Sequence, residues 1–230
     1  MIELLHGDCL EVMRKGLDYD VIVTDPPFNV GYKYKSYKDK MIEDEYYDML
    51  KNIIKDTPCV VIHYAEQLHK LSIKLNKAPD RVISWVYNSN TPRQHRQIAF
   101  YDIKPDFKAV GQPYKNLKDK RIIKRMLEGK SAKLYDWWNI NQVKNVSKEK
   151  TDHPCQMPQE VMDNIIGIIP KGLTILDPFM GSGTTGLSCK KLNRNFIGIE
   201  LDETYFKIAK DRIDNTDATE EVDDTLNLIK

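Results

Sequence analysis

The strongest constraint on the fold is a glycine-rich turn between two apolar runs near the end of the chain. The run TILD leads into PFMGSGTTG, a helical segment follows, and a second run, NFIGIE, ends in an acid at Glu200. A strand, a GxGxxG turn, a helix and a second strand with a terminal acid form the unit that holds a nucleoside cofactor in open α/β sheets. The predicted cofactor-binding residues of this unit are Asp177, Pro178, Phe179, Gly181, Ser182, Gly183, Thr184, Thr185, Glu200 and Leu201.

Apolar runs alternate with helical patterns through most of the chain. Other runs typical of buried strands are IELLHGD, VIVTD, CVVIHY and RVISWVY, and helical patterns such as YYDMLKNIIKD and QEVMDNIIGII lie between the runs. The alternation predicts an α/β fold with a doubly wound, mostly parallel sheet. It fails over residues 90–150, where a polar, basic and aromatic stretch predicts an insertion outside the core.

Asp177 indicates which cofactor the glycine turn holds. A pyrophosphate would lie at the start of the following helix, where a carboxylate just before the turn would repel it. S-adenosylmethionine has no phosphate and carries a cationic amino group, which an acid suits, while Glu200 can accept hydrogen bonds from both ribose hydroxyls. Only about thirty residues follow Glu200, too few for the second half of a dinucleotide fold. We therefore predict S-adenosylmethionine as the cofactor.

Two motifs together resemble a known family. DPPF at residues 25–28 and DPFMGSGTT at residues 177–185 are similar to the motifs of the amino-methylating DNA methyltransferases, which act on adenine N6 or cytosine N4. The acceptor motif precedes the cofactor motif, an order that resembles the beta-type, circularly permuted members. The resemblance implies a Rossmann-like methyltransferase fold with a catalytic domain at 1–89 and 151–213, an inserted target-recognition region at 90–150 and an acidic tail at 214–230.

Two further stretches resemble the same family. GDCLEVM is similar to its short acidic motif, which implies cofactor contacts from Asp8, to the adenine amino group, and from Cys9. HPCQMP is similar to its HPTQKP box, with Cys and Met in place of the usual Thr and Lys. The matching positions of the box imply cofactor contacts from His153, Gln156 and Pro158, and the resemblance adds Asp25 to the cofactor-binding residues.

The DPPF corner fits methyl transfer to an exocyclic amine, a poor nucleophile because its lone pair is delocalised into the base. The Asp25 carboxylate can accept one N–H and help to remove the proton. The Pro26 carbonyl can accept the other N–H, and Pro26 and Pro27 fix its direction because proline locks φ. Phe28 offers a ring face for a flipped base. Catalysis would then depend on positioning, without a metal and without a covalent intermediate.

The charge distribution predicts a nucleic-acid partner. Residues 104–150 hold thirteen Lys or Arg against five Asp or Glu, although the whole chain has a net charge of +1. Such a basic segment suits a polyanion, and the family resemblance implies that this polyanion is double-stranded DNA. Phosphate contacts position a protein and base contacts give specificity, and the sequence leaves open which residue does which. The predicted DNA-binding residues are Arg93, His95, Arg96, Lys118, Arg121, Lys124 and Arg125.

Other features narrow the class of protein. Four scattered cysteines without a CxxC pair, and the lack of a signal peptide or a long apolar span, predict a reduced cytoplasmic protein without a structural metal or a membrane partner. We expect Trp137 and Trp138 to pack the insertion against the catalytic domain. His63 and Tyr64 end an apolar run, so they face either the cleft or the core.

The leading hypothesis is a site-specific N6-adenine DNA methyltransferase. Methylation of cytosine N4 is the nearest alternative, although relatives with that activity usually carry Ser where Asp25 stands. An NAD-dependent oxidoreductase and a non-catalytic nucleic-acid-binding module are alternatives from other classes, and the intact Asp25, Asp177 and Glu200 favour the methyltransferase. The resemblance leaves a homodimer and a cognate restriction endonuclease open as partners.

Overall fold

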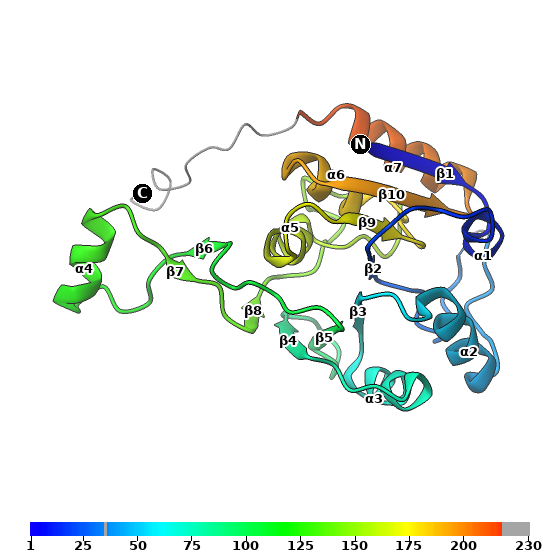
Figure 1. Ribbon diagram of the computed structural model, residues 1–230, viewed down its shortest axis with the longest axis horizontal. Helices are drawn as coiled ribbons and strands as arrows, with labels where there is room; N and C mark the ends of the chain where they lie inside the picture. Colours follow the sequence, from blue (N-terminus) through cyan, green and yellow to red (C-terminus); the bar gives the residue numbers. More distant parts are fainter. Residues whose placement is uncertain (35, 218–230) are drawn as a thin grey trace.

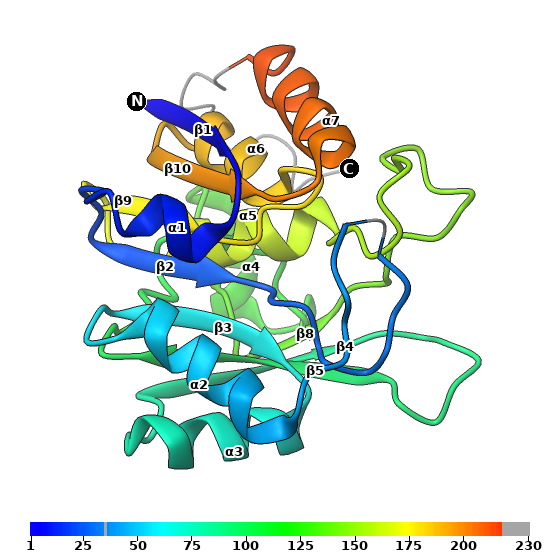
Figure 2. The ribbon, with the colours of Figure 1, turned by 90° about the vertical axis from the view of Figure 1, so that its right-hand side faces the viewer.

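One eight-stranded sheet with helices on both of its faces forms the body of the protein (Figures 1 and 2). The structure is a computed structural model, and it describes residues 1–34 and 36–217. The strands are β1 (Ile2–His6), β2 (Val21–Thr24), β3 (Cys59–His63), β4 (Arg81–Val86), β5 (His95–Tyr101), β6 (Gly111–Gln112), β7 (Ala132–Lys133), β8 (Trp137–Asn139), β9 (Thr174–Asp177) and β10 (Asn195–Glu200).

The helices of the described chain are all short. They are α1 (Cys9–Met13), α2 (Glu43–Ile54), α3 (Ala65–Leu75), α4 (Lys120–Leu127), α5 (Gln159–Ile168), α6 (Thr184–Lys191) and α7 (Glu203–Asp214). Within residues 1–34 and 36–217, no helix combines the length and the apolar character that a bilayer crossing demands. The acidic tail expected at 214–230 lies outside the described residues from position 218 onward.

The strand order is β1-β10-β9-β2-β3-β5-β4-β8, and only the two pairings of β5 are antiparallel. The predicted doubly wound, mostly parallel sheet is therefore confirmed. β9 and β2 lie side by side in its middle, paired at Ile175 and Val21. The chain leaves these two strands toward opposite edges, so a crevice opens at their carboxyl ends. Asp177 ends β9 and Asp25 directly follows β2, so both motifs start at this crevice.

Successive side chains of the central strands pack against different helix layers. Val21 and Val23 belong to the core with α5, α6 and α7, whereas Ile22 belongs to the core with α1, α2 and α3. All three side chains are fully buried. Burial on both faces explains why the parallel strands are nearly continuous apolar runs in the sequence.

Part of the stretch 90–150 belongs to the sheet, whereas we expected all of it to lie outside the core. β5 pairs with β3 and β4, and β8 extends the sheet beside β4. Residues 98–101 of β5 are fully buried. The first half of β5, with His95, Arg96 and Gln97, is polar and incompletely buried, and only the second half carries an apolar signal. Four apolar residues are too few to distinguish a strand by pattern alone.

The basic arm, residues 111–133, extends away from the sheet (Figure 1). It consists of α4 carried on a two-stranded ribbon of β6 and β7. No residue of α4 is buried, and Leu127 is 85 % exposed. Asp119 caps the helix by accepting the Arg121 N–H at 2.8 Å. The cap satisfies an N–H at the start of α4, and the helix presents its basic side chains to solvent.

Only one of the two neighbouring tryptophans is packed. Trp138 is 4 % exposed and its indole N–H donates to the Tyr135 carbonyl at 2.8 Å, whereas Trp137 is 49 % exposed. A third tryptophan, Trp85 in β4, is 1 % exposed and donates to the Ile140 carbonyl at 2.7 Å. Trp85 and Trp138 therefore tie the end of the insertion to the sheet.

We predict that Trp85→Ala lowers the free energy of unfolding by about 3–5 kcal/mol, because it leaves a large cavity and an unpaired carbonyl in the core. Trp137→Ala, the control, should change it by less than about 0.5 kcal/mol because the side chain is half exposed. Urea denaturation followed by circular dichroism measures both values. Equal losses in the two variants would contradict this description of the core.

Candidate active site

A pocket of about 330 Å³ lies at the carboxyl ends of β9 and β2. Residues from both ends of the chain line it, because β1, β2, β9 and β10 are neighbours in the sheet. All of the predicted ones come from four separate motifs of the sequence except Arg96, which comes from β5. The predicted residues that line the pocket are Asp8, Cys9, Asp25, Pro26, Pro27, Phe28, Arg96, His153, Pro178, Phe179, Gly181, Glu200 and Leu201.

The glycine turn after β9 is shaped by Asp177. The carboxylate of Asp177 is 3 % exposed and accepts the Thr185 hydroxyl at 2.5 Å and the Phe179 N–H at 3.0 Å. Burial raises its pKa to about 7, against the opposing effect of the Thr185 hydrogen bond. The sequence predicts that Asp177 faces a cofactor cation, but in the structure its carboxylate points into the glycine turn and binds groups of the turn itself. Asp177, Ser182, Gly183, Thr184 and Thr185 do not line the pocket.

His153 packs against the glycine turn and explains one of its glycines. A Cβ on Gly181 would lie 2.9 Å from His153 Nε2, and Gly181 also has φ +52°. The His153 ring contacts Tyr205 edge-on at 4.5 Å, and burial lowers its pKa to about 4, so it is neutral near pH 7. The HPCQMP stretch therefore meets the cofactor turn through His153.

Gln156 and Pro158 have structural positions instead of lining the pocket. The Gln156 side-chain oxygen accepts the Thr151 N–H at 2.8 Å, and its amide donates to the Glu149 carbonyl at 2.6 Å. Pro158 is the N-cap of α5. Both residues hold the segment that leads into α5, and this segment places His153 beside the glycine turn.

Glu200 joins the glycine turn to the start of α7. One carboxylate oxygen accepts the Gly181 N–H at 2.9 Å and the other accepts the Asp202 N–H at 2.8 Å. Burial raises the pKa of Glu200. A carboxylate has about four acceptor positions, so each oxygen keeps one for a ligand hydroxyl. The Gly7 N–H donates to the Glu200 carbonyl at 2.9 Å, which brings Asp8 and Cys9 to the same end of the pocket.

Asp25 stands at the other end of the pocket with few hydrogen-bond donors around it. Its Oδ2 lies 3.5 Å from Arg96 Nη1, and its Oδ1 is buried without a hydrogen-bond partner among residues 1–34 and 36–217. Burial raises the pKa of Asp25 to about 6, and the Arg96 charge offsets part of this effect. The carboxylate is therefore available to accept an N–H from a ligand.

A directed hydrogen-bond chain holds the peptide after Pro27. The Tyr64 N–H donates to His63 Nδ1 at 2.8 Å, so the ring proton of the neutral His63 lies on Nε2. Nε2 lies 2.9 Å from the Tyr46 hydroxyl, which donates to the Pro27 carbonyl at 2.7 Å. Burial lowers the pKa of His63 to about 3 and keeps the ring neutral. His63, left open between core and cleft, is thus a buried support of the DPPF corner.

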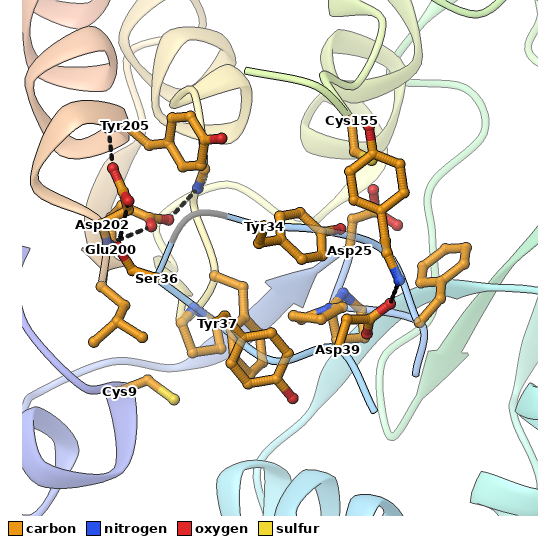
Figure 3. Close-up of a pocket in the computed structure, with 18 of the residues that line it drawn as sticks. Cys9, Asp25, Tyr34, Ser36, Tyr37, Asp39, Cys155, Glu200, Asp202 and Tyr205 are labelled. Atoms are coloured by element: carbon orange, nitrogen blue, oxygen red, sulfur yellow. Dashed lines mark hydrogen bonds between the residues drawn. The ribbon is translucent and has the colours of Figure 1, made fainter. Parts of the chain in front are cut away.

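A tyrosine-rich strap crosses the pocket and was missed by sequence reasoning. The strap comprises residues 29–34 and 36–41 (Figure 3). Asp39 folds it back by accepting the N–H groups of Asn29, Val30 and Tyr32 at 2.7–3.1 Å. Ser36 donates to Asp202 Oδ2 at 2.5 Å and links the strap to the N-cap of α7. Three tyrosines within residues 32–37 were the available signal.

The predicted DNA-binding residues fall into three places. Arg96 lines the pocket. Arg93 contacts Tyr64, a residue that lines the pocket, with its guanidinium 3.9 Å from the ring centroid, and it pairs with Glu66 at 2.5 Å. His95 is exposed at the start of β5. The basic arm carries the others, Lys118, Arg121, Lys124 and Arg125. Arg121 is held by Asp119 at 2.8 Å.

The pocket therefore has two chemically different halves. The glycine turn, Glu200 and Asp8 surround a half suited to a nucleoside with hydroxyl groups. Asp25, the two prolines and Phe28 surround a half suited to an N–H donor. The parallel pairing of β2 with β9 places the two halves side by side, as transfer between two ligands requires.

We predict that Glu200→Gln weakens binding of S-adenosylhomocysteine by at least about tenfold, because the neutral amide cannot accept both backbone N–H groups and the ligand hydroxyls. Glu203→Gln is the matched control, since Glu203 is exposed and pairs with Lys207 at 2.7 Å. Isothermal titration calorimetry measures both affinities. Equal affinities in the two variants would contradict this position of the ligand.

Comparison with known proteins finds a matching family and similar sequences. The family described as DNA methylase, of N6 and N4 methyltransferases, matches residues 19–211. The type II methyltransferase M.HpaI of Haemophilus parainfluenzae is 27 % identical, over 85 % of this chain and 68 % of its own length. The DNA adenine methyltransferase YhdJ of Escherichia coli is 24 % identical, over 92 % of this chain and 82 % of its own length.

A solved structure, that of the M1.HpyAVI–SAM complex, matches with a TM-score of 0.61 and 28 % identity. The match covers 94 % of this chain and 100 % of the other. The predicted methyltransferase fold is confirmed by this likeness. Since the family match spans most of the sequence and includes both motifs of the pocket, the protein belongs to the DNA methylase family of N6 and N4 methyltransferases.

Proposed function

We propose that the protein transfers a methyl group from S-adenosylmethionine to the N6 amine of an adenine flipped out of double-stranded DNA. The observation that carries the proposal is the Asp25 carboxylate, which is buried with one oxygen unpartnered among the described residues and lies in the same pocket as the glycine turn.

The cofactor half of the pocket fits S-adenosylmethionine. Glu200 has acceptor positions left for ribose hydroxyls, Asp8 can accept from an adenine amine, and Phe179 and Leu201 add apolar surface. Gly181 keeps the turn free of a Cβ beside His153. M1.HpyAVI, which has a related fold, was solved with this cofactor. When bound, S-adenosylmethionine supplies an electrophilic methyl group.

The acceptor half fits an amine. Asp25 accepts one N–H of the amine, and the Pro26 carbonyl accepts the other. The hydrogen-bond chain of His63 and Tyr46 holds the Pro27 carbonyl, and this fixes the backbone of the DPPF corner and the direction of the Pro26 carbonyl beside it. Two acceptors draw the amine toward tetrahedral geometry and free its lone pair, and Asp25 takes the proton that leaves. Positioning in a mostly apolar pocket then supplies much of the rate.

Adenine is favoured over cytosine by the acid at position 25. Relatives that methylate cytosine N4 usually carry Ser there, and the similar protein YhdJ is named as an adenine methyltransferase. The basic arm is proposed to contact DNA phosphates through Lys118, Lys124 and Arg125. A homodimer and a cognate endonuclease stay predictions from resemblance.

The test is sequencing of genomic DNA that reports both N6-methyladenine and N4-methylcytosine, from methylation-free cells that express the chain. We expect N6-methyladenine in one sequence context, and no modification in cells expressing Asp25→Ala at equal protein levels. N4-methylcytosine alone would contradict the choice of base. Unmodified DNA in both cultures, with soluble and folded protein, would contradict the function.

The single-turnover rate should fall about tenfold per pH unit below about pH 6 and be level above it. The reason is that the pKa of Asp25 is raised to about 6, and only the ionised carboxylate accepts the amine. Asp25→Asn should lower the rate by about 10²–10⁴-fold and remove this acid limb. Rapid-quench assays at saturating cofactor measure both profiles, and an unchanged acid limb in Asp25→Asn would contradict the assignment.

Tyr46→Phe should lower the methyl-transfer rate by about tenfold, because the Pro27 carbonyl and His63 Nε2 lose the hydroxyl that joins them. Affinity for S-adenosylhomocysteine should stay unchanged. Tyr47→Phe is the matched control on the same helix, since the Tyr47 hydroxyl donates to Gln67 instead. Equal rates in both variants would show that the chain does not position the corner.

A further inference from the structure

Arg96 lies in the acceptor half of the pocket, whereas we expected it on a DNA-binding surface. It is part of β5 and pairs in register with Trp85 of β4. Its side chain is 14 % exposed and lines the pocket together with Asp25 and Phe28. Arg96 therefore lies beside Asp25 and Phe28, the groups that are proposed to bind the target base.

The guanidinium of Arg96 contacts both of those groups. Nη1 lies 3.5 Å from Asp25 Oδ2, and the guanidinium carbon lies 4.7 Å from the centroid of the Phe28 ring. The Trp85 centroid is 5.4 Å away. The 3.5 Å separation is long for a hydrogen bond, and Arg96 Nε is buried without a partner among the described residues. The contact between the guanidinium and Asp25 thus depends on charge and not on a tight hydrogen bond, and aromatic rings surround the guanidinium.

The Phe28 ring has no open face in this arrangement. The His63 ring stacks on it with centroids 4.1 Å apart and planes 19° apart. Tyr64 approaches edge-on at 4.8 Å, and Phe28 as a whole is 9 % exposed. Because His63 is anchored by hydrogen bonds through both ring nitrogens, the removable contact is the one with Arg96.

A guanidinium and an aminated base share the features that matter at this position. Both are planar and delocalised, both stack on aromatic rings, and both present N–H groups at their edge. The carboxylate of Asp25 and the ring of Phe28 therefore accept Arg96 for the same reasons that they would accept adenine.

We propose that Arg96 is a positioning residue for Asp25 and occupies the place of the target base until the base displaces it. This inference rests on the proposed function. The exchange replaces the Arg96 cation beside Asp25 by an N–H donor of the base, so the buried carboxylate is never without a favourable neighbour, which would be costly. A group without an N–H donor cannot complete the exchange.

The ionisable groups around Asp25 come from five parts of the fold. They are Arg96 of β5, Tyr46 of α2, Asp177 of β9, Tyr34 of the strap and Cys155 of the HPCQMP stretch. Burial raises the pKa values of both tyrosines and of Cys155, so all three are neutral near pH 7. Arg96 is the cation of this group, and removing it should raise the pKa of Asp25.

The experiment compares the wild type with Arg96→Ala, Arg96→Lys and Arg81→Ala. Arg81 is the matched control, because it is an arginine of the neighbouring strand β4 with an ion pair to Asp136 at 3.5 Å and a ring contact with Phe107 at 5.8 Å. The probe is a duplex that contains the sequence found methylated in cells, with 2-aminopurine next to the target adenine, so that the target keeps its N6 amine and the neighbouring fluorophore reports its unstacking. Fluorescence at saturating protein and S-adenosylhomocysteine reports the flipped fraction, and single-turnover rates on the unmodified duplex give the pH profile.

In Arg96→Ala we expect a larger flipped fraction, DNA affinity stronger by about three- to tenfold, and an acid limb moved to higher pH. Arg96→Lys should keep the acid limb near the wild-type position, because lysine keeps the positive charge beside Asp25. It should raise the flipped fraction, because lysine lacks the planar guanidinium that stacks on Phe28. Arg81→Ala should match the wild type.

An equal or smaller flipped fraction in Arg96→Ala, with normal wild-type methylation, overturns the inference alone. Wild-type protein that transfers no methyl group to DNA overturns the proposed function as well. Unchanged titration with S-adenosylhomocysteine shows that each variant has a folded pocket.

Discussion

The functional centre depends on the parallel pairing of β9 with β2 in the middle of the sheet. The two strands lie about 150 residues apart in the chain, and their pairing at Ile175 and Val21 aligns their carboxyl ends. Each end carries an acid followed by proline, so two motifs that are distant in sequence form one pocket. Because both strands are buried on both faces, their register is fixed by the two helix layers and not by the pocket.

This pairing concentrates buried carboxyl groups. Asp25, Asp177 and Glu200 lie near one another, and burial raises the pKa of each. The fold compensates each in a different way. Asp177 receives a hydroxyl and a backbone N–H, and Glu200 receives two backbone N–H groups. Among the described residues, Asp25 receives only the long 3.5 Å contact with Arg96. The least compensated acid is the one proposed to meet the substrate, as expected where a polar group is kept available for a ligand.

The sequence predicted the parts of the fold whose pattern is local. Each of the strands β1–β4, β9 and β10 is an apolar run, and each of the helices α2, α3 and α5–α7 has a helical pattern. β5 was missed because its first half is polar and supplies Arg96 to the pocket, and these polar residues break the apolar pattern that would mark a strand. The strap was missed because Asp39 holds it through backbone N–H groups, which no side-chain periodicity records.

The sequence by itself determined the two motifs, their permuted order and the α/β alternation, and these suffice for the family. Only the tertiary structure decided that Asp177 supports the turn, that His63 supports the DPPF corner, and that Arg96 lies between Asp25 and Phe28. The physical reason is that residue type and spacing are local properties. The direction of a side chain depends on neighbouring strands, here β3, β4 and β5, which come together only when the sheet forms.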